Sequence, residues 1–296
     1  MRDPEYDRFG PWILEITDKD PIPLIFEPYV NLDESEYAFK VPRPMERREL
    51  SPGMNLYDYL VVFFPSYMTI LQRSGEEVAK SDIRYNVVVT VEHIEDLLDG
   101  RLRIYTEDDV FEIYYSTVSA DIIENAVKGI CRRYIQDKPP TEIMPTPPAL
   151  LPDIDGLSFY FNGLLRELKE RKTGQEHAPE LIGFQSETKV SSLENRWWAR
   201  LFYGAINVKL QESMHFIDSS ELRIVDRGRL WKYRWQLVMG KRSRFIPVHR
   251  IDTIEIAETK ITAEVWQLSI RTAVHSHVFL LSSDSPLVEF YRRFNH

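Results

Sequence analysis

A dense run of basic residues in the last third of the chain is the strongest candidate for chemistry. Between Glu221 and Arg250, nine Lys and Arg stand against two Asp and Glu, a local charge of +7 (9 − 2). Alternate side chains of a strand share a face, so Lys232 and Arg234 would lie together, and a hairpin would bring further cations beside them. Such a cluster can hold a phosphate or another anion. The candidate ligands are Lys232, Arg234, Lys241, Arg242 and Arg244.

The same basic run has a second interpretation, in which its cations form ordinary surface. They would then meet nearby acids or dock on the acidic first half of the chain. Residues 1–140 carry 16 basic and 27 acidic side chains, a net charge of −11, whereas residues 141–296 carry 21 and 19, a net charge of +2. The sum is the −9 of the whole chain. Because an acidic chain repels phosphate backbones, we expect no nucleic-acid partner.

Three histidines are the candidate metal ligands. His275 and His277 alternate in a predicted strand and would share a face, and His249 could lie on a neighbouring strand. Three imidazoles can bind zinc. Since no carboxylate or cysteine completes the set at a recognisable spacing, we expect hydrogen-bonded histidines, no metal and no cofactor.

Motifs of catalysis are missing from the sequence. It contains no GxGxxG, P-loop, HExxH or GxSxG pattern. Its single cysteine, Cys131, lies beside the apolar stripe of a predicted helix, which favours a structural role. We therefore expect a protein that is not an enzyme. A lone cysteine, a charged N-terminus and the lack of a long apolar run indicate a cytoplasmic protein, which could still lie peripherally on a membrane.

The elements that position these residues begin with a group of predicted strands. Residues 58–64, 66–72, 82–92 and 110–116 are rich in β-branched and aromatic side chains, and Asp99-Gly100 predicts a turn before a strand containing Leu102 and Ile104. The apolar period then changes to that of a helix. Its buried stripe is predicted to be Ile123, Val127, Ile130 and Tyr134, with Ser119 as the N-cap.

Six prolines between Pro139 and Pro152 predict a domain boundary. We divide the chain into a proline-rich arm (1–57), a first unit (58–138), a linker (139–152) and a second unit (153–296) with an N-terminal extension (153–220). Strands of the second unit are predicted at 221–225, 229–238, 244–250, 253–257, 265–272 and 277–282. A final helix is predicted from Ser285-Pro286 to Phe294.

The second unit repeats the first in sequence. Val91-Glu92-His93-Ile94-Glu95 corresponds to Val248-His249-Arg250-Ile251-Asp252, and Leu102-x-Ile104-x-Thr106 corresponds to Leu268-x-Ile270-x-Thr272. Each unit also ends its helix on Arg-Arg-aromatic. Because these similarities occur in the same order, we predict an internal duplication.

Strands closed by one C-terminal helix resemble the pleckstrin-homology-like (PH-like) superfold. The final helices carry Cys131 and Tyr291 but no tryptophan, which is more similar to bacterial PH-like domains than to the eukaryotic family. The resemblance implies an α+β, mainly antiparallel β fold of two PH-like barrels or bent sheets, each closed by a C-terminal helix. In phosphoinositide-binding members, a lysine on one strand and an arginine pair on the next surround the phosphates. The resemblance assigns these places to Lys232 and Arg242-Ser243-Arg244.

The expected function is that of a binding or scaffolding protein with two PH-like units. A protein or peptide partner would bind the basic hairpin or add a strand to an exposed sheet edge. The competing hypothesis is a membrane-surface sensor that reads acidic headgroups through the basic hairpin 229–250. A third is an enzyme of unrecognised type, which would need a deep pocket with perturbed titratable groups. The sequence carries no signal for an oligomeric state.

Overall fold

The computed structural model describes residues 6, 9–135, 160–165, 179–190, 206–218, 220–227, 231–233, 240–259 and 264–293. The side chains of residues 47, 189, 206–209 and 231–233 lie outside this description. The proline-rich linker 139–152 and Arg234 also lie outside it. The described part divides into two compact units: Met1–Val88 with Glu95–Asp137, and Val89–Ile94 with Lys138–His296.

The first unit contains a five-stranded antiparallel sheet whose strands follow chain order. Aromatic and β-branched residues are frequent in its second and third strands, and its inner face packs on the arm through Phe26, Leu60 and Leu71. The terminal strand at one end has two residues and the one at the other end has eight. The strands are β1 (Leu14–Glu15), β2 (Tyr37–Pro42), β3 (Tyr57–Phe63), β4 (Tyr67–Ser74) and β5 (Glu77–Arg84).

The chain leaves this sheet through a short 3-10 turn that the sequence did not indicate. Residues 82–92 were predicted as one strand, but η3 (Tyr85–Val87) separates β5 from β6 (Val88–Asp96). Tyr85 causes the break, because its hydroxyl donates to Phe64 O over 3.0 Å and its N–H to Ser66 O over 3.4 Å. The predicted turn at Asp99-Gly100 is displaced to Leu97-Leu98, since β7 (Asp99–Thr106) already begins at Asp99.

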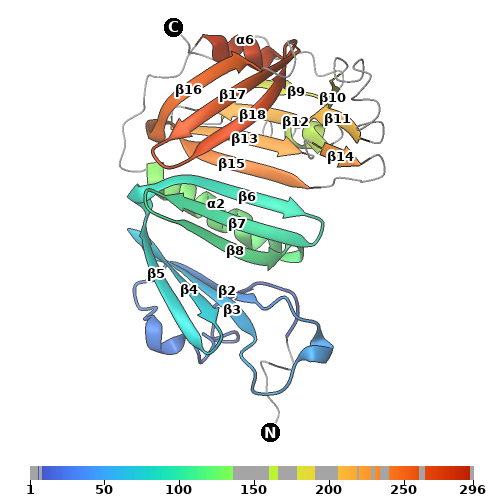
Figure 1. Cartoon of the computed structure of the whole chain (residues 1–296). Coiled ribbons are helices and arrows are strands. Elements are labelled where there is room, and N and C mark those ends of the chain that lie inside the picture. Colours follow the sequence, from blue (N-terminus) through green and yellow to red (C-terminus); the bar gives the residue numbers. More distant parts are fainter. Residues whose placement is uncertain are drawn as a thin grey trace. The chain divides into compact units, whose positions relative to one another are not determined.

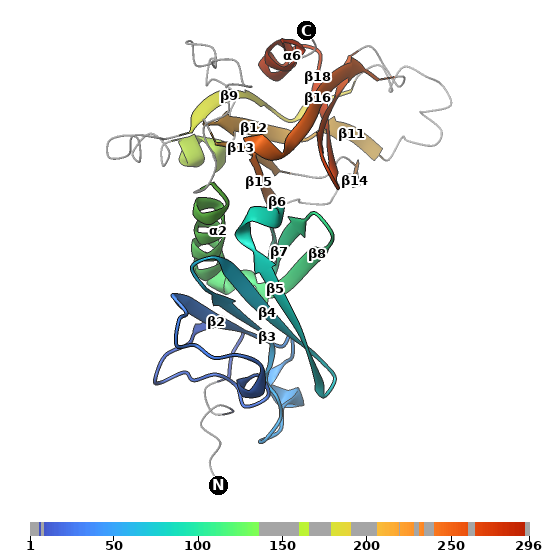
Figure 2. The same cartoon turned by 90° about the vertical axis from the view of Figure 1, so that its left-hand side faces the viewer.

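The strand β8 (Val110–Ser116) pairs with β7, and the helix α2 (Ala120–Ile135) runs beside this hairpin (Figures 1 and 2). The predicted helix stripe is confirmed: Ile123, Val127, Ile130 and Tyr134 are buried. Among the described residues, neither α2 nor any other helix combines the length and apolarity needed to cross a membrane.

The second unit has two main antiparallel sheets. Four strands adjoin in the order β15, β13, β12 and β9, and β16, β17 and β18 form a three-stranded sheet over them (Figure 1). A smaller sheet holds β10, β11 and β14. Their bounds are β9 (Glu180–Gln185), β10 (Thr188–Lys189), β11 (Ile206–Leu210), β12 (Glu212–Ile217), β13 (Glu221–Arg227), β14 (Trp231–Tyr233), β15 (Lys241–Pro247), β16 (Ile251–Glu258), β17 (Val265–Thr272) and β18 (Ser276–Ser282).

The final helix α6 (Pro286–Arg292) packs on this arrangement, as predicted. The Ser285 hydroxyl caps it by accepting from Leu287 N–H, and Leu287, Phe290 and Tyr291 are buried. A Cβ at Gly183 of β9 would lie 3.1 Å from Leu287 Cδ2, so this glycine permits the close approach of helix and strand.

The fold is therefore α+β and mainly antiparallel β. Of the two predicted forms, barrels or bent sheets, the closed barrel is not found among the described residues, because each described sheet has two terminal strands. The order of elements recurs along the chain. Four antiparallel strands (β2–β5), η3, three strands (β6–β8) and α2 are followed later by β9, β12, β13, β15, then η5 (Val248–Arg250), β16–β18 and α6. The two series differ by η4 (Thr117–Ser119) before α2 in the first, and by β10, β11 and β14 of the smaller sheet in the second.

Candidate functional site

Arg244 of the predicted anion cluster lies inside the second unit. Its Nη1 is 2.6 Å from Asp226 Oδ2, and its Nε is 3.0 Å from Glu92 Oε1. The guanidinium also lies over the Phe279 ring, 4.9 Å from its centroid. Both carboxylates are buried. Two acids thus occupy the hydrogen-bonding positions that an anion would need at Arg244.

Of the other predicted cations, Lys241 and Arg242 lie among the described residues, whereas the side chains of Lys232 and Arg234 do not. Arg242 Nε is 3.6 Å from the same Glu92 Oε1, with the Arg242 side chain 43% exposed. Burial lowers the pKa of the Lys241 ammonium. The backbone of Lys232 lies in β14, while its side chain and Arg234 fall outside the described residues. The structure therefore brings Arg242 and Arg244 together around a shared carboxylate, and an anion site that includes Lys232 and Arg234 stays a prediction.

The predicted histidine group is only partly assembled. His275 and His277 lie with ring centroids 4.6 Å apart, and His277 Nε2 is 3.2 Å from Thr90 Oγ1. His249 lies in η5. Within the described ranges, no group of three or more His, Cys, Asp or Glu is placed to hold a metal ion. Burial, with Arg244 nearby, lowers the pKa of His277 to about 3.

The structure contains a further buried histidine that was not predicted from the sequence. His215 of β12 is fully buried, and its Nδ1 is 2.8 Å from the Tyr291 hydroxyl. Burial, with the Arg244 charge as a smaller cause, lowers its pKa to about 3. The sequence marks it weakly, because His215 lies between the apolar residues Met214 and Phe216 in a strand that also contains the polar residues Glu212 and Ser213.

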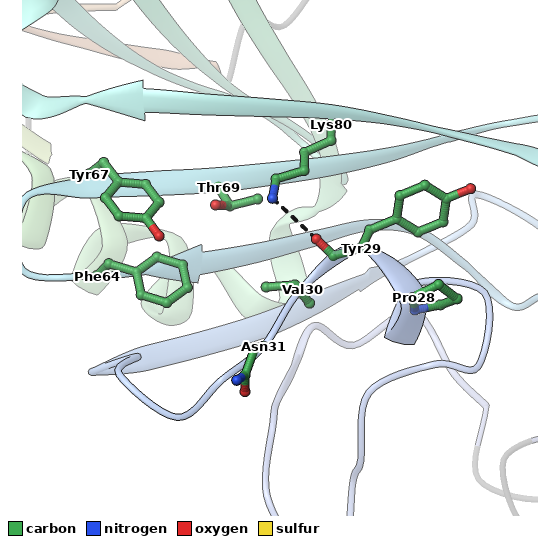
Figure 3. A pocket seen from close by; sticks show the side chains of 8 residues that line it. All are labelled: Pro28, Tyr29, Val30, Asn31, Phe64, Tyr67, Thr69 and Lys80. Carbon is green, nitrogen blue, oxygen red and sulfur yellow. Dashed lines mark hydrogen bonds between the residues drawn. The ribbon is translucent and has the colours of Figure 1, made fainter.

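A pocket of about 380 Å³ lies in the first unit, between the arm and the face of β4 and β5 (Figure 3). Lys80 closes one side by donating from Nζ to Tyr29 O over 3.2 Å. On another side Phe64 and Tyr67 stack with ring centroids 4.6 Å apart. The lining residues are Pro28, Tyr29, Val30, Asn31, Phe64, Tyr67, Thr69 and Lys80.

The strand β5, which supplies Lys80, is the terminal strand of its sheet, and among the described strands it pairs with β4 alone. A two-residue turn joins the two strands, with Gly75 at φ +67°. Such a turn makes Ser74 and Glu77 a hydrogen-bonded pair, and bonded pairs then alternate along the ladder. The bond from Tyr85 N to Ser66 O continues this alternation. The backbone groups of Val78, Lys80, Asp82 and Arg84 therefore point away from β4.

The N–H and C=O groups of Val78, Lys80 and Asp82, together with the Arg84 N–H, have no hydrogen-bond partner within the part of the chain that the structure describes. The Arg84 C=O differs, because Arg84 is the N-cap of η3 and its carbonyl accepts the first bond of that 3-10 turn. The β4–β5 register also runs from Tyr67 to Ser74 without a bulge. Residues directly opposite share a face, so Asp82 lies on the side of Thr69, and Arg84 on the side of Tyr67. The side chains of the outward-facing positions thus stand on the face that carries the pocket.

Sequence comparison gives no relative: no protein family matches the chain, and no curated protein matches it. Among solved structures, the chain is similar to a DUF1696 family protein with a pleckstrin-homology domain from Shewanella loihica PV-4. The two are 14% identical, and the match covers 42% of this chain and 99% of that chain with a TM-score of 0.28.

Proposed function

We propose that this chain is a non-enzymatic binding or scaffolding protein of two PH-like units that captures an extended peptide on the edge of β5. The observation that carries the proposal is the row of outward-facing backbone groups on Val78, Lys80 and Asp82, together with the Arg84 N–H, which have no partner among the described residues. A peptide in extended conformation offers the N–H and C=O groups that complete such a row.

The form of β5 supports a binding role over an ordinary sheet edge. Folded proteins usually protect their edges with very short strands, charged side chains, prolines or bulges. The opposite end of the same sheet follows this rule, because β1 has two residues. In contrast, β5 has eight residues, no proline and no bulge. Four of its eight side chains are charged, which is one form of edge protection, but its length and even register leave the outward backbone groups able to pair with another strand.

The recurrence of elements supports the two-unit part of the proposal. Apart from η4 in the first series and β10, β11 and β14 in the second, each series has four antiparallel strands, a 3-10 turn, three strands and a helix. The 3-10 turns η3 and η5 occupy equivalent places, so Tyr85 corresponds to Val248, where the sequence similarity had paired Val91 with Val248. We propose an internal duplication with this shifted register.

The test uses the full chain and a random-peptide library displayed on phage. Lys80→Pro removes an outward N–H without removing a donor to β4, whereas Lys80→Thr loses the same ammonium but keeps the N–H. We expect wild type and Lys80→Thr to bind the selected peptides, and Lys80→Pro to bind them at least about tenfold more weakly. Equal binding by both variants, with unchanged unfolding midpoints, would rule out the β5 edge.

The competing proposal is a membrane-surface sensor in the cytoplasm. It rests on Lys232, Arg234, Lys241 and Arg242, since Arg244 is paired with two buried acids. Co-sedimentation with neutral and with anionic vesicles, at low and high salt, separates the two proposals. Binding to anionic vesicles that salt abolishes, and that Lys241→Ala with Arg242→Ala removes, would favour the sensor.

A further inference from the structure

The side chains beside the β5 edge specify what kind of peptide fits there, if β5 is the binding edge proposed above. An antiparallel strand paired with β5 places alternate residues directly opposite Val78, Lys80, Asp82 and Arg84. These alternate side chains lie on the face that carries the pocket, because opposite residues share a face. The β5 site therefore contacts the side chain of every second residue of the peptide.

Arg84 is a charged residue on this face whose side chain is available to a bound peptide. It is exposed, and it forms no ion pair or side-chain hydrogen bond with any described residue. Its neighbours are already engaged: Asp82 Oδ1 accepts from the Thr69 hydroxyl over 2.6 Å, and Lys80 Nζ lies 3.6 Å from Asp82 Oδ2. A carboxylate on the peptide residue opposite Arg84 would complete a cross-strand ion pair.

The pocket selects the next residue on the same face, which lies opposite Asp82. Thr69 of the pocket wall is paired with Asp82 across the ladder. Two strand spacings, roughly 9.6 Å, separate an added strand from β4, so only a long side chain can reach across β5 into the pocket. The stacked rings of Phe64 and Tyr67 offer an aromatic surface there (Figure 3). An aromatic ring fits this geometry best.

We infer that the β5 site recognises an extended, antiparallel segment with the pattern acidic-x-aromatic, in which the acid pairs with Arg84 and the ring enters the pocket. The direction fixes the order, because an antiparallel partner meets Arg84 before it meets Asp82. The net charge of the whole chain would not produce a preference for acidic peptides. With a net charge of −9, non-specific attraction would enrich basic peptides.

The experiment repeats the phage selection on the full-length protein with two charge-reversal variants. Arg84→Glu reverses the proposed contact, and Arg271→Glu makes the same change at an exposed position of the second unit. We expect wild type and Arg271→Glu to enrich acidic-x-aromatic. Arg84→Glu should enrich basic-x-aromatic, and a synthetic acidic peptide should bind it about fivefold more weakly than wild type.

The outcomes separate this inference from the function on which it rests. Peptides that bind wild type, lose binding to Lys80→Pro and show no acidic-x-aromatic pattern would overturn the inference and leave the edge proposal standing. The same holds if the acid is enriched but does not change with Arg84→Glu. If no peptide is selected, or if Lys80→Pro binds as well as Lys80→Thr, both fail.

Discussion

Arg244 and Asp226 form a buried ion pair in the second unit, with Nη1 2.6 Å from Oδ2. Glu92 contacts the same guanidinium from the other side, with its Oε1 3.0 Å from Nε. A basic residue that the sequence assigned to anion capture is thereby part of the interior of the unit. Its charge is balanced by acids that are 18 and 152 positions away along the chain.

Removal of Asp226 should destabilise the second unit strongly. Asp226→Ala leaves Arg244 with one of its two buried acids, and breaking such a pair costs about 3–5 kcal/mol. The matched control is Glu255→Ala, which removes an exposed pair with Arg271 and should cost no more than about 1 kcal/mol. Urea unfolding monitored by tryptophan fluorescence measures both. Equal costs for the two variants would contradict the structural role of Arg244.

His215 should make stability fall as the pH is lowered. Its pKa is about 3 in the folded protein and about 6.5 when unfolded, so between these values only the unfolded chain takes up the proton. The stabilising contribution is complete above pH 6.5 and is lost progressively towards pH 3. His277 acts in the same direction. We expect His215→Gln to have a shallower fall in unfolding free energy between pH 6.5 and 4 than wild type. An unchanged slope would exclude His215 as a source.

Replacing Leu97 by glycine should stabilise the folded protein. It has φ +54° in the turn before β7, a conformation that costs a side-chain-bearing residue about 1–2 kcal/mol, and its side chain is 67% exposed. Leu97→Gly should therefore raise the unfolding free energy by up to about 1 kcal/mol. Leu98→Gly, at an equally exposed position with ordinary φ, should not stabilise. A destabilised Leu97→Gly would show that the leucine side chain contributes to the fold.

Ser119 should connect the arm to the start of α2. Its hydroxyl accepts from Ile13 N–H over 3.1 Å, across 106 positions of the chain. Ser119→Ala leaves that buried N–H unpaired and should cost about 1–3 kcal/mol. Ser116→Ala serves as a control on the same segment. Thermal unfolding compares them, and a loss below that of the control would contradict this connection.

The sequence predicted local features better than contacts between distant residues. The buried stripe of α2, the start of α6 at Ser285-Pro286 and the exact bounds of β8 and β17 follow from period and propensity over a few residues. Ser119 was predicted as a helix cap, but its hydroxyl bonds to Ile13, which no local pattern could indicate. The 3-10 turn at Tyr85 was also missed, because the valines that follow dominate the strand signal.

The candidate site was harder to predict for the same reason. The basic run gave Arg242 and Arg244, but their partner Glu92 comes from a strand 152 positions before Arg244. The pocket beside Lys80 combines residues of β4 and β5 with a proline-containing stretch of the arm, a segment with no periodicity to mark it. The outward positions of β5 depend on which strand ends the sheet, and this is a property of topology.

Native-state amide hydrogen exchange along β5 measures whether the outer edge of this strand is open to a partner. We expect protection to alternate along the strand, because the Ser81 and Ile83 amides bond to β4 and the Lys80 and Asp82 amides point outward. The Lys80 and Asp82 amides should exchange at least about tenfold faster than the other two. A peptide bound at the edge should then slow Lys80 and Asp82 and leave Ser81 and Ile83 unchanged. Equal protection of all four amides in the free protein would mean that the edge is already covered, and would contradict the account.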